Sequence, residues 1–361
     1  MLKREEKVGL SEQDLYTYSR QIVLSEIGYE GQERLRAAKV CVVGLGGLGC
    51  PAALQLTAMG IGHLRIVDRD VVERSNLHRQ YLYDTSQIGL PKVEAAILKL
   101  EKLNPDVELD PYPLHVDYSN AKRIVQGMDV VIDGLDSLGP RYAINQACVE
   151  LGVPYVFGAA IETFGSVSTI LPEKTPCLKC FYADIDESLL PACSVVGVHV
   201  SATSIVSSLE VAEAARIVVG SDPVLAGRLL FFDLSRVEFD KIEIRRSEDC
   251  PVCGKKRAEV HRSRGSIKIE EVCSRGGRRT FIVVPREDLS LDLSAIRARV
   301  KSEMGIPSEQ SRLSLTFDLE DGARMMFLQT GVSILEGRID GDAALAKYRW
   351  ITDALNLHEM G

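Results

Sequence analysis

Closely spaced glycines follow a short apolar run near the start of the chain, in the order Val43-Gly44-Leu45-Gly46-Gly47-Leu48-Gly49. Glycine lets the backbone approach a phosphate closely, and a helix that begins there offers it free N–H groups. Asp68 ends the next apolar run, at a place where a carboxylate can reach a ribose hydroxyl. The pattern predicts a nucleotide-binding turn, but it specifies neither the nucleotide nor the reaction.

Basic and polar residues follow this turn. In the segment 75–80, Asn76 and Arg79 suit ribose and phosphate, because a guanidinium pairs well with planar groups of phosphate oxygens. Lys92 is expected in the first turn of a helix, where a cation is unfavourable unless a bound phosphate compensates for it. Taken alone, Arg79 or Lys92 is more often a solvated surface charge than a phosphate ligand.

Two carboxylates lie at the end of the predicted strand 129–133. Asp136 comes just after the strand, at the carboxyl edge where open α/β sheets bind ligands, and it is expected to carry Mg²⁺ on the phosphates of the nucleotide. Asp133 ends the strand itself, and this position favours a structural or helix-capping role.

The cysteines suggest two kinds of chemistry. Cys177 with Cys180, and Cys250 with Cys253, form two CxxC pairs, which together predict a closed and therefore structural Cys₄ zinc site. The alternative is one redox CxxC pair beside a coincidental one. Cys193 lies in a predicted loop, where it is either a nucleophilic thiol or a small buried apolar residue.

Strand-like and helix-like segments alternate through the first 254 residues, which predicts an α/β fold with a mostly parallel, Rossmann-like sheet. Beyond the glycine unit, strands are expected at 107–116, 129–133, 153–160, 166–171 and 229–244. Helices are expected near 91–103, 141–151 and 203–219. Residues 1–254 are therefore expected to form one domain that carries both the nucleotide site and the zinc site.

The composition changes near Gly254, and a basic segment, 255–265, reads as an exposed linker. Residues 266–361 are expected to form a small α+β domain of unknown role. Its predicted strands are 267–272, 279–284, 312–318 and 323–329, with helices near 291–304 and 341–355. Glu320-Asp321-Gly322 is expected to form a hairpin turn.

Composition restricts the function further. The chain has 361 residues and a net charge of −8, which argues against a general nucleic-acid binder. It lacks the run of about 18 apolar residues that a membrane span needs, and its first residues lack the apolar core of a signal peptide. We therefore expect a cytoplasmic protein with no membrane partner. Nine cysteines in such a protein indicate metal ligation or thiol chemistry rather than disulfides.

The ordered set of motifs resembles the MoeB/ThiF family of adenylyltransferases, relatives of the ubiquitin-activating enzymes. The resemblance covers about residues 12–254. It rests on the segments Tyr18–Ile22, Val43–Gly49, Asp68–Asp70, Ser75–Gln80 and Gly89–Val93, and on the paired CxxC motifs. It implies a Rossmann-like enzyme that uses ATP to adenylate the C-terminal glycine of a small ubiquitin-like sulfur-carrier protein ending in Gly-Gly. Pyrophosphate is released, and the carrier then serves sulfur transfer, with a sulfur-donor protein, or conjugation.

The resemblance also implies roles for individual residues. Arg20 matches an arginine that reaches the partner subunit's site, so a homodimer is implied, and Cys193 matches a cysteine used covalently in some members. Arg20, Arg79, Lys92 and an Asp136-bound Mg²⁺ would neutralise the reacting anions, and no general base is needed. The residues that match nucleotide-binding positions are Gly47, Asp68, Ser75, Asn76, Arg79, Lys92 and Asp136. The candidate cofactor-binding set adds their neighbours Gly44, Gly46, Asp70, Gln80 and Ser137.

The chain departs from the family pattern at three places. Asp136-Ser137 replaces an Asp-Asn pair, which is expected to weaken one phosphate or ribose contact. The residues after Cys193 lack the usual acidic pattern, so the role of this cysteine stays open. The tail lacks a rhodanese-type active-site loop, so direct sulfur transfer is not expected there.

Two other functions compete with adenylation. An NAD-dependent dehydrogenase would use the glycine turn and Asp68, but it gives Arg79, Lys92 and the Cys₄ pattern no role. A catalytically inactive activating-enzyme-like subunit, acting as a binding partner, is the non-enzymatic alternative. The presence of Arg20, Arg79, Lys92 and Asp136 argues against it.

Overall fold

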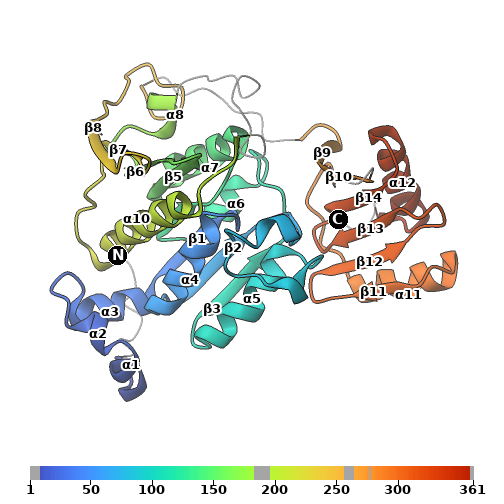
Figure 1. Cartoon of the computed structure of the whole chain (residues 1–361), viewed down its shortest axis with the longest axis horizontal. Coiled ribbons are helices and arrows are strands. Elements are labelled where there is room, and N and C mark those ends of the chain that lie inside the picture. The colour runs from blue at the N-terminus through green and yellow to red at the C-terminus, as the bar shows by residue number, and fades with distance from the viewer. Residues whose placement is uncertain (1–8, 183–195, 256–263, 276–277, 358–361) are drawn as a thin grey trace.

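Two β-sheets organise the chain (Figure 1). This computed structural model describes residues 9–182, 196–255, 264–275 and 278–357. The first sheet lies within residues 39–243, and the second lies within residues 268–337. The helices and the mostly parallel first sheet confirm the predicted α/β class.

The first sheet has the strand order β3-β2-β1-β4-β5-β6-β7-β8. Its first five strands run parallel, and β6, β7 and β8 continue it in antiparallel fashion. Val43, the last residue of β1, pairs with both Val67 of β2 and Asp133 of β4. The carboxyl ends of these three strands are therefore level, and the loops that follow them meet at one edge. The strands are β1 Lys39–Val43, β2 His63–Val67, β3 Glu108–Tyr112, β4 Val130–Asp133, β5 Tyr155–Ile161, β6 Phe164–Ile170, β7 Arg228–Asp233 and β8 Glu238–Glu243.

Helices cover both faces of this sheet, because the buried strands are apolar on both sides. Val40 and Val42 of β1 pack into the core beneath α4, α5 and α10, whereas Cys41 and Val43 pack into the core beneath α6 and α7. This alternation is the ordinary two-residue period of a strand. The helices are α1 Glu12–Thr17, α2 Ser19–Ile22, α3 Gly28–Ala37, α4 Gly49–Met59, α5 Lys92–Leu103, α6 Ala121–Val125, α7 Leu138–Leu151, α8 Leu178–Tyr182 and α10 Val200–Val219. Two 3₁₀ turns, η1 Arg74–Asn76 and η2 Thr85–Gln87, lie between β2 and α5.

The second sheet is antiparallel, in the order β11-β12-β13-β14-β10-β9. Two helices, α11 Leu293–Met304 and α12 Gly341–Ala354, pack their apolar residues onto one of its faces. The predicted hairpin is present, since Gly322 adopts φ +78° and Leu319 N–H donates to Ala323. The strands are β9 Lys268–Arg275, β10 Arg278–Val284, β11 Ser308–Gln310, β12 Ser314–Asp318, β13 Arg324–Leu328 and β14 Ser333–Gly337.

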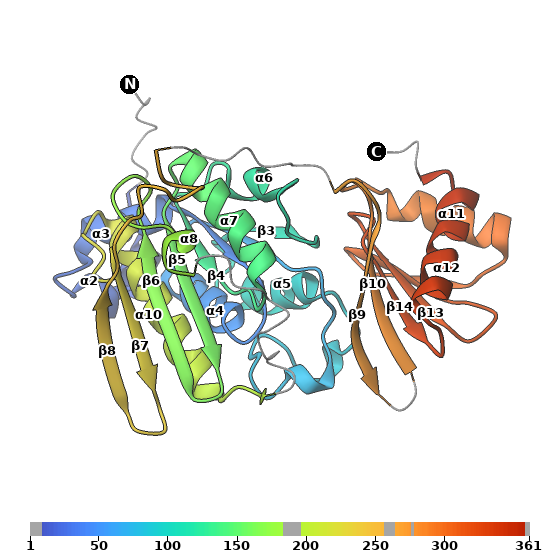
Figure 2. The ribbon, with the colours of Figure 1, turned by 90° about the horizontal axis from the view of Figure 1, so that it is seen from above.

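The second sheet and its helices, here called the C-terminal region (264–275 and 278–357), lie beside α5 and β3 (Figure 2). Arg264 is buried and pairs with Asp117 at 2.6 Å and with Asp288 at 2.7 Å. Asp117 precedes α6, and Asp288 belongs to the C-terminal region. Ion pairs through the buried Arg264 therefore connect the C-terminal region to the part of the chain that contains the first sheet. Across the described ranges, no helix is long and apolar enough to cross a bilayer.

Candidate functional site

Three glycines meet where the loops after β1 and β4 cross. A Cβ added at Gly49 would lie 1.7 Å from the Gly44 carbonyl oxygen, and one added at Gly134 would lie 2.3 Å from the same atom. Gly44 also adopts φ +90°, which side chains disfavour. The crossing therefore requires glycine, and it brings the amino end of α4 to the carboxyl edge of the sheet, where phosphates bind in this class of fold.

Asp68 fixes the backbone of this turn. One carboxylate oxygen accepts from Leu45 N–H at 2.7 Å, and the other accepts from Asp70 N–H at 2.7 Å. Burial raises the pKa of Asp68. The side chain predicted to bind ribose thus lies beside the glycine turn, and it links the loops that follow β1 and β2.

Lys92, the first residue of α5, lies with its side chain almost buried beside Asp70. Its ammonium donates to Asp70 Oδ2 at 2.8 Å. Burial alone would lower the pKa of Lys92, but the charges of Asp68 and Asp70 raise it overall. The ammonium therefore stays charged at the carboxyl edge, as a ligand for phosphate oxygens must.

The segment 75–80 lies against the glycines. A Cβ at Gly47 would lie 3.5 Å from Arg79 Cδ and 3.1 Å from Thr203 Cγ2, and a Cβ at Gly46 would lie 4.0 Å from Gln80 Nε2. Gln80 is 2% exposed, and its Oε1 has no hydrogen-bond partner among the described residues. A buried amide oxygen without a partner fits a site that a polar ligand completes.

Ser75 and Asn76 are held by their own loop. Ser75 Oγ donates to Glu73, and its carbonyl oxygen accepts from Arg79 at 3.0 Å. Asn76 Oδ1 accepts from Glu73 N–H at 3.1 Å. These local bonds set the backbone of the segment and orient Arg79 toward Gly47.

Asp136 and Asp133 differ in their surroundings. Asp136 is exposed in the loop after β4, and Ser137 is the residue that precedes α7. Asp133 is fully buried, where it accepts from Tyr155 at 2.6 Å and Leu135 N–H at 2.9 Å and pairs with Arg141 at 3.0 Å. The buried partners give Asp133 a structural role, and they leave Asp136 as the carboxylate of this loop that solvent and a hydrated cation can reach.

Arg20 and Cys193 do not join this set. Arg20 is exposed on α2, and its neighbour Gln21 donates to the Met59 carbonyl at 3.0 Å, at the carboxyl end of α4. The glycine turn lies at the opposite end of that helix, whose 11 residues span about 16 Å. Arg20 therefore lies far from the glycine turn of its own chain. Cys193 lies outside the described residues.

Four cysteines form a compact cluster apart from the glycine turn. Their sulfur atoms lie within 4.8 Å of one another, with Cys177–Cys250 at 3.7 Å and Cys180–Cys253 at 3.4 Å. These separations are too long for disulfides, and they are close to the edge of about 3.8 Å of a tetrahedron with zinc–sulfur bonds of about 2.3 Å. The cluster joins the start of α8 to the turn after β8, and its geometry fits a closed metal site.

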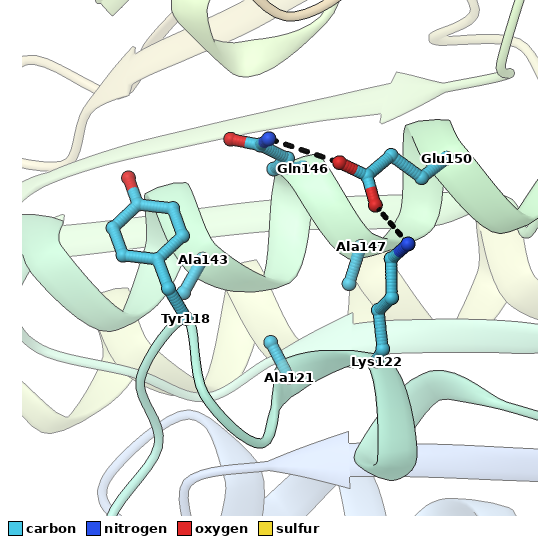
Figure 3. A pocket seen from close by; sticks show the side chains of 7 residues that line it. All are labelled: Tyr118, Ala121, Lys122, Ala143, Gln146, Ala147 and Glu150. Carbon is cyan, nitrogen blue, oxygen red and sulfur yellow. Dashed lines mark hydrogen bonds and ion pairs between the residues drawn. The ribbon is translucent and has the colours of Figure 1, made fainter. Parts of the chain in front are cut away.

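A small hollow between α6 and α7 is a separate feature (Figure 3). Its volume of about 10 Å³ is room for roughly one water molecule. Lys122 and Glu150, which line it, pair at 2.5 Å and tie the two helices together. A nucleotide cannot enter this hollow, so it does not compete with the carboxyl edge.

The chain is similar to known proteins in its sequence and in its fold. The family model described as "ThiF family" matches residues 18–252, which is more than half of the sequence. The match includes the glycine turn and three of the four clustered cysteines, and it ends one residue before the fourth, Cys253. The chain belongs to the ThiF family. The whole of the C-terminal region lies outside this match, so this ThiF-family chain extends beyond the part that the family model covers.

Two curated relatives align with this ThiF-family chain over 68% of its length and over 92% of their own. The "SAMP-activating enzyme E1" of Haloferax volcanii is 40% identical over 248 residues, and the "Sulfur carrier protein adenylyltransferase" of Thermus thermophilus is 41% identical over 250 residues. The crystal structure of E. coli MccB superposes with a TM-score of 0.61 at 23% identity, covering 70% of this chain and 75% of that one. This likeness shows the shared fold.

Three residues near the site were not predicted from the sequence. Gly134 closes the crossing with Gly44, and a glycine directly after a buried strand was the available signal. Thr203, from the start of α10, packs against Gly47 with no sequence signal. Arg69 lies between the predicted Asp68 and Asp70, and its importance appears only from its partners in the C-terminal region.

Proposed function

We propose that this protein uses ATP to adenylate the C-terminal glycine of a small ubiquitin-like sulfur-carrier protein that ends in Gly-Gly, with release of pyrophosphate. The observation that carries the proposal is the convergence of Lys92, Arg79 and the glycine turn at the carboxyl edge of the sheet. The names of the two curated relatives support the same reaction and the same class of partner.

The reaction needs charge neutralisation more than proton transfer. A carboxylate must attack the α-phosphate, and both are anions, so cations at the site lower the barrier. Lys92 has three N–H donors and can keep Asp70 while it binds a phosphate oxygen. Arg79 offers a planar fork of donors beside Gly47. The carrier glycine is already ionised at neutral pH and needs no base.

Magnesium would be held by Asp136, whose exposure leaves room for the water ligands that Mg²⁺ retains. When bound, the ion supplies further positive charge for the phosphates. Asp68 would bind ribose, while Gly44, Gly46 and Gly47 lie close to the phosphates. Ser75, Asn76, Gln80 and Ser137 complete the set, with Gln80 Oε1 available to a donor on the nucleotide.

A homodimer completes the site in this proposal. Arg20 lies near the carboxyl end of α4, whereas the glycine turn of the same chain lies at the amino end of that helix. Arg20 would therefore act in the partner subunit. Exposed apolar side chains lie on α1, on α3 and in the segment after α2, and they offer a surface that a second subunit could cover: Leu15, Tyr16, Val23, Leu24 and Tyr29.

The remaining assignments follow from the same proposal. The Cys₄ cluster would hold one structural Zn²⁺, and a sulfur-donor protein would act after adenylation, in the cytoplasm. Cys193 is proposed as the residue for any covalent step. Residues 1–254 would form the adenylyltransferase domain, 255–265 a linker, and 266–361 a second domain.

Isotope exchange between pyrophosphate and ATP tests the reaction. The protein, Mg·ATP and a carrier ending in Gly-Gly should support exchange, because adenylate formation is reversible while pyrophosphate is present. The same carrier without its last two residues is the control, and it should give only background exchange. Exchange at an equal rate with both carriers would show that the terminal glycine is not the substrate.

A further inference from the structure

The C-terminal region packs directly on the loop that follows β2. Val71 of this loop packs against an apolar cluster on the face of the second sheet opposite α11 and α12. The buried members of this cluster are Ile282, Val284, Leu328, Val332 and Ile334. Val71 lies next to Asp70, so the loop that presents Asp70 to Lys92 is covered by the C-terminal region.

The same region also holds the first turn of α5. Glu94, two residues after Lys92, accepts hydrogen bonds from Ser311 Oγ at 2.7 Å and from Leu313 N–H at 3.0 Å. Leu313 is itself buried in the core beneath α5. Lys92 N–H donates to the Asp70 carbonyl at 2.9 Å, which joins the two supported segments.

Arg69, in the loop after β2, pairs with a carboxylate of the C-terminal region. Its guanidinium donates to Glu270 Oε2, on β9, at 2.5 Å and to His115 Nδ1 at 2.8 Å. Arginine only donates, so His115 accepts in its neutral form. In agreement, burial and the nearby charge of Arg69 lower the pKa of His115 to about 4.

Arg69 is also close to the carboxylates of the candidate site. Its Nε lies 3.9 Å from Asp70 Oδ1. Burial would lower the pKa of Arg69, but Glu270, Asp70 and Asp136 together raise it, so Asp136 is also within its electrostatic reach. The guanidinium thus lies within ion-pair distance of two carboxylates, Asp70 and Glu270, and its shorter contact is the one to Glu270.

We propose that Glu270 is a positioning residue for the nucleotide site: by holding Nη2 of Arg69, it limits the contact between this guanidinium and Asp70 to the long one through Nε, so that Asp70 stays with Lys92 and Asp136 stays available to Mg²⁺. This inference rests on the proposed function, and it makes the C-terminal region an intramolecular part of the ATP site. A guanidinium released from Glu270 would move toward the nearest carboxylates and compete with the metal ion.

Glu270→Gln in the full-length protein tests this role, with Glu271→Gln as the matched control. Glu271 is the next residue of β9, and its carboxylate pairs with Arg279 within the C-terminal region at 2.5 Å. The readout is the Mg²⁺ concentration that gives half-maximal ATP binding, measured by calorimetry. Because the Arg69–Glu270 pair is partly exposed, we expect an increase of about threefold in Glu270→Gln and no change in Glu271→Gln.

Arg69→Met in the Glu270→Gln background separates positioning from folding. With no guanidinium left to compete, the double variant should need no more Mg²⁺ than Arg69→Met alone. An unchanged Mg²⁺ requirement in folded Glu270→Gln would overturn the proposal, as would a double variant that retains the threefold increase. If Glu270→Gln does not fold, Glu270→Asp should show a smaller increase of the same sign, and no increase would again overturn it.

The test remains separate from that of the reaction, because ATP binding needs no carrier protein. A wild-type chain that binds Mg·ATP but gives no pyrophosphate exchange would contradict the proposed function alone. A wild-type chain that binds no Mg·ATP would overturn both.

Discussion

At the scale of single residues, Lys92 is a buried cation of the candidate site. Only 5% of its surface is exposed, yet the neighbouring carboxylates keep its ammonium charged. A buried charge with a single ion-pair partner is costly unless the site uses it. A phosphate that shares this ammonium would explain why the lysine begins α5, at a helix end that disfavours cations.

Lys92→Ala should therefore reduce pyrophosphate exchange at least about tenfold, which corresponds to about 1.4 kcal/mol of transition-state stabilisation. Asp136→Ala should reduce it by a similar factor and raise the Mg²⁺ requirement. Lys99→Ala is the control, since Lys99 is exposed on the same helix and should exchange at the wild-type rate. Unchanged exchange in both Lys92→Ala and Asp136→Ala would exclude this site.

Most of the residues at the carboxyl edge could be predicted from the sequence. Glycine spacing, a carboxylate at a strand end and a lysine after Pro91 are local patterns, and level strand ends bring them together. Arg69 was not predicted as a site residue, because its partner Glu270 is 201 positions away and ion pairs leave no periodic signal. Arg20 was predicted from a resemblance, and its place on α2 is consistent with action in another subunit.

At the scale of elements, long apolar or periodic segments were predicted well, whereas the strand expected at 229–244 is two strands, β7 and β8, and two short strands were missed. The parallel strands, α5 and the hairpin before β13 agree with expectation within a few residues. The strand β11, Ser308–Gln310, is three polar residues long and was missed, as was β14, Ser333–Gly337. Both are strands because a neighbouring strand pairs with them, which is a tertiary effect.

At this scale, the loss of metal tests whether the Cys₄ cluster is a zinc site. Purified protein should contain close to one zinc ion per chain. Cys250→Ser should lose the ion and melt at least about 5 °C lower, since a zinc ion bound there would join α8 to the segment after β8. Cys148→Ser, at another fully buried cysteine outside the cluster, should lose stability but keep its zinc. Full zinc content in Cys250→Ser would exclude this ligand set.

At the scale of the whole molecule, the proposed active site requires two chains. Arg20→Ala and Lys92→Ala should each be inactive alone, and mixing them should restore activity, because one site of each mixed dimer has both residues intact. Random subunit exchange makes half of the dimers mixed, so recovery should approach roughly one quarter of wild-type activity. Activity is measured by pyrophosphate exchange.

Two controls accompany this experiment, one expected to be fully active and one expected to be inactive. Lys99→Ala mixed with wild type should lose nothing, and Lys92→Ala mixed with the double variant Arg20→Ala/Lys92→Ala should recover nothing. If verified mixed dimers of the two single variants stay inactive, Arg20 acts within its own chain or the two sites are coupled. A tandem-linked dimer would then separate these explanations.

The central claim is transfer of AMP to the carrier, and labelled ATP tests it most directly. With ATP labelled at the α-phosphate, the protein should place label on the carrier's terminal glycine, and the carrier should lose it again when pyrophosphate is added. With ATP labelled at the γ-phosphate, label should appear only in pyrophosphate. Label from the γ-phosphate on the carrier, or no label on the carrier from either ATP, would contradict the account.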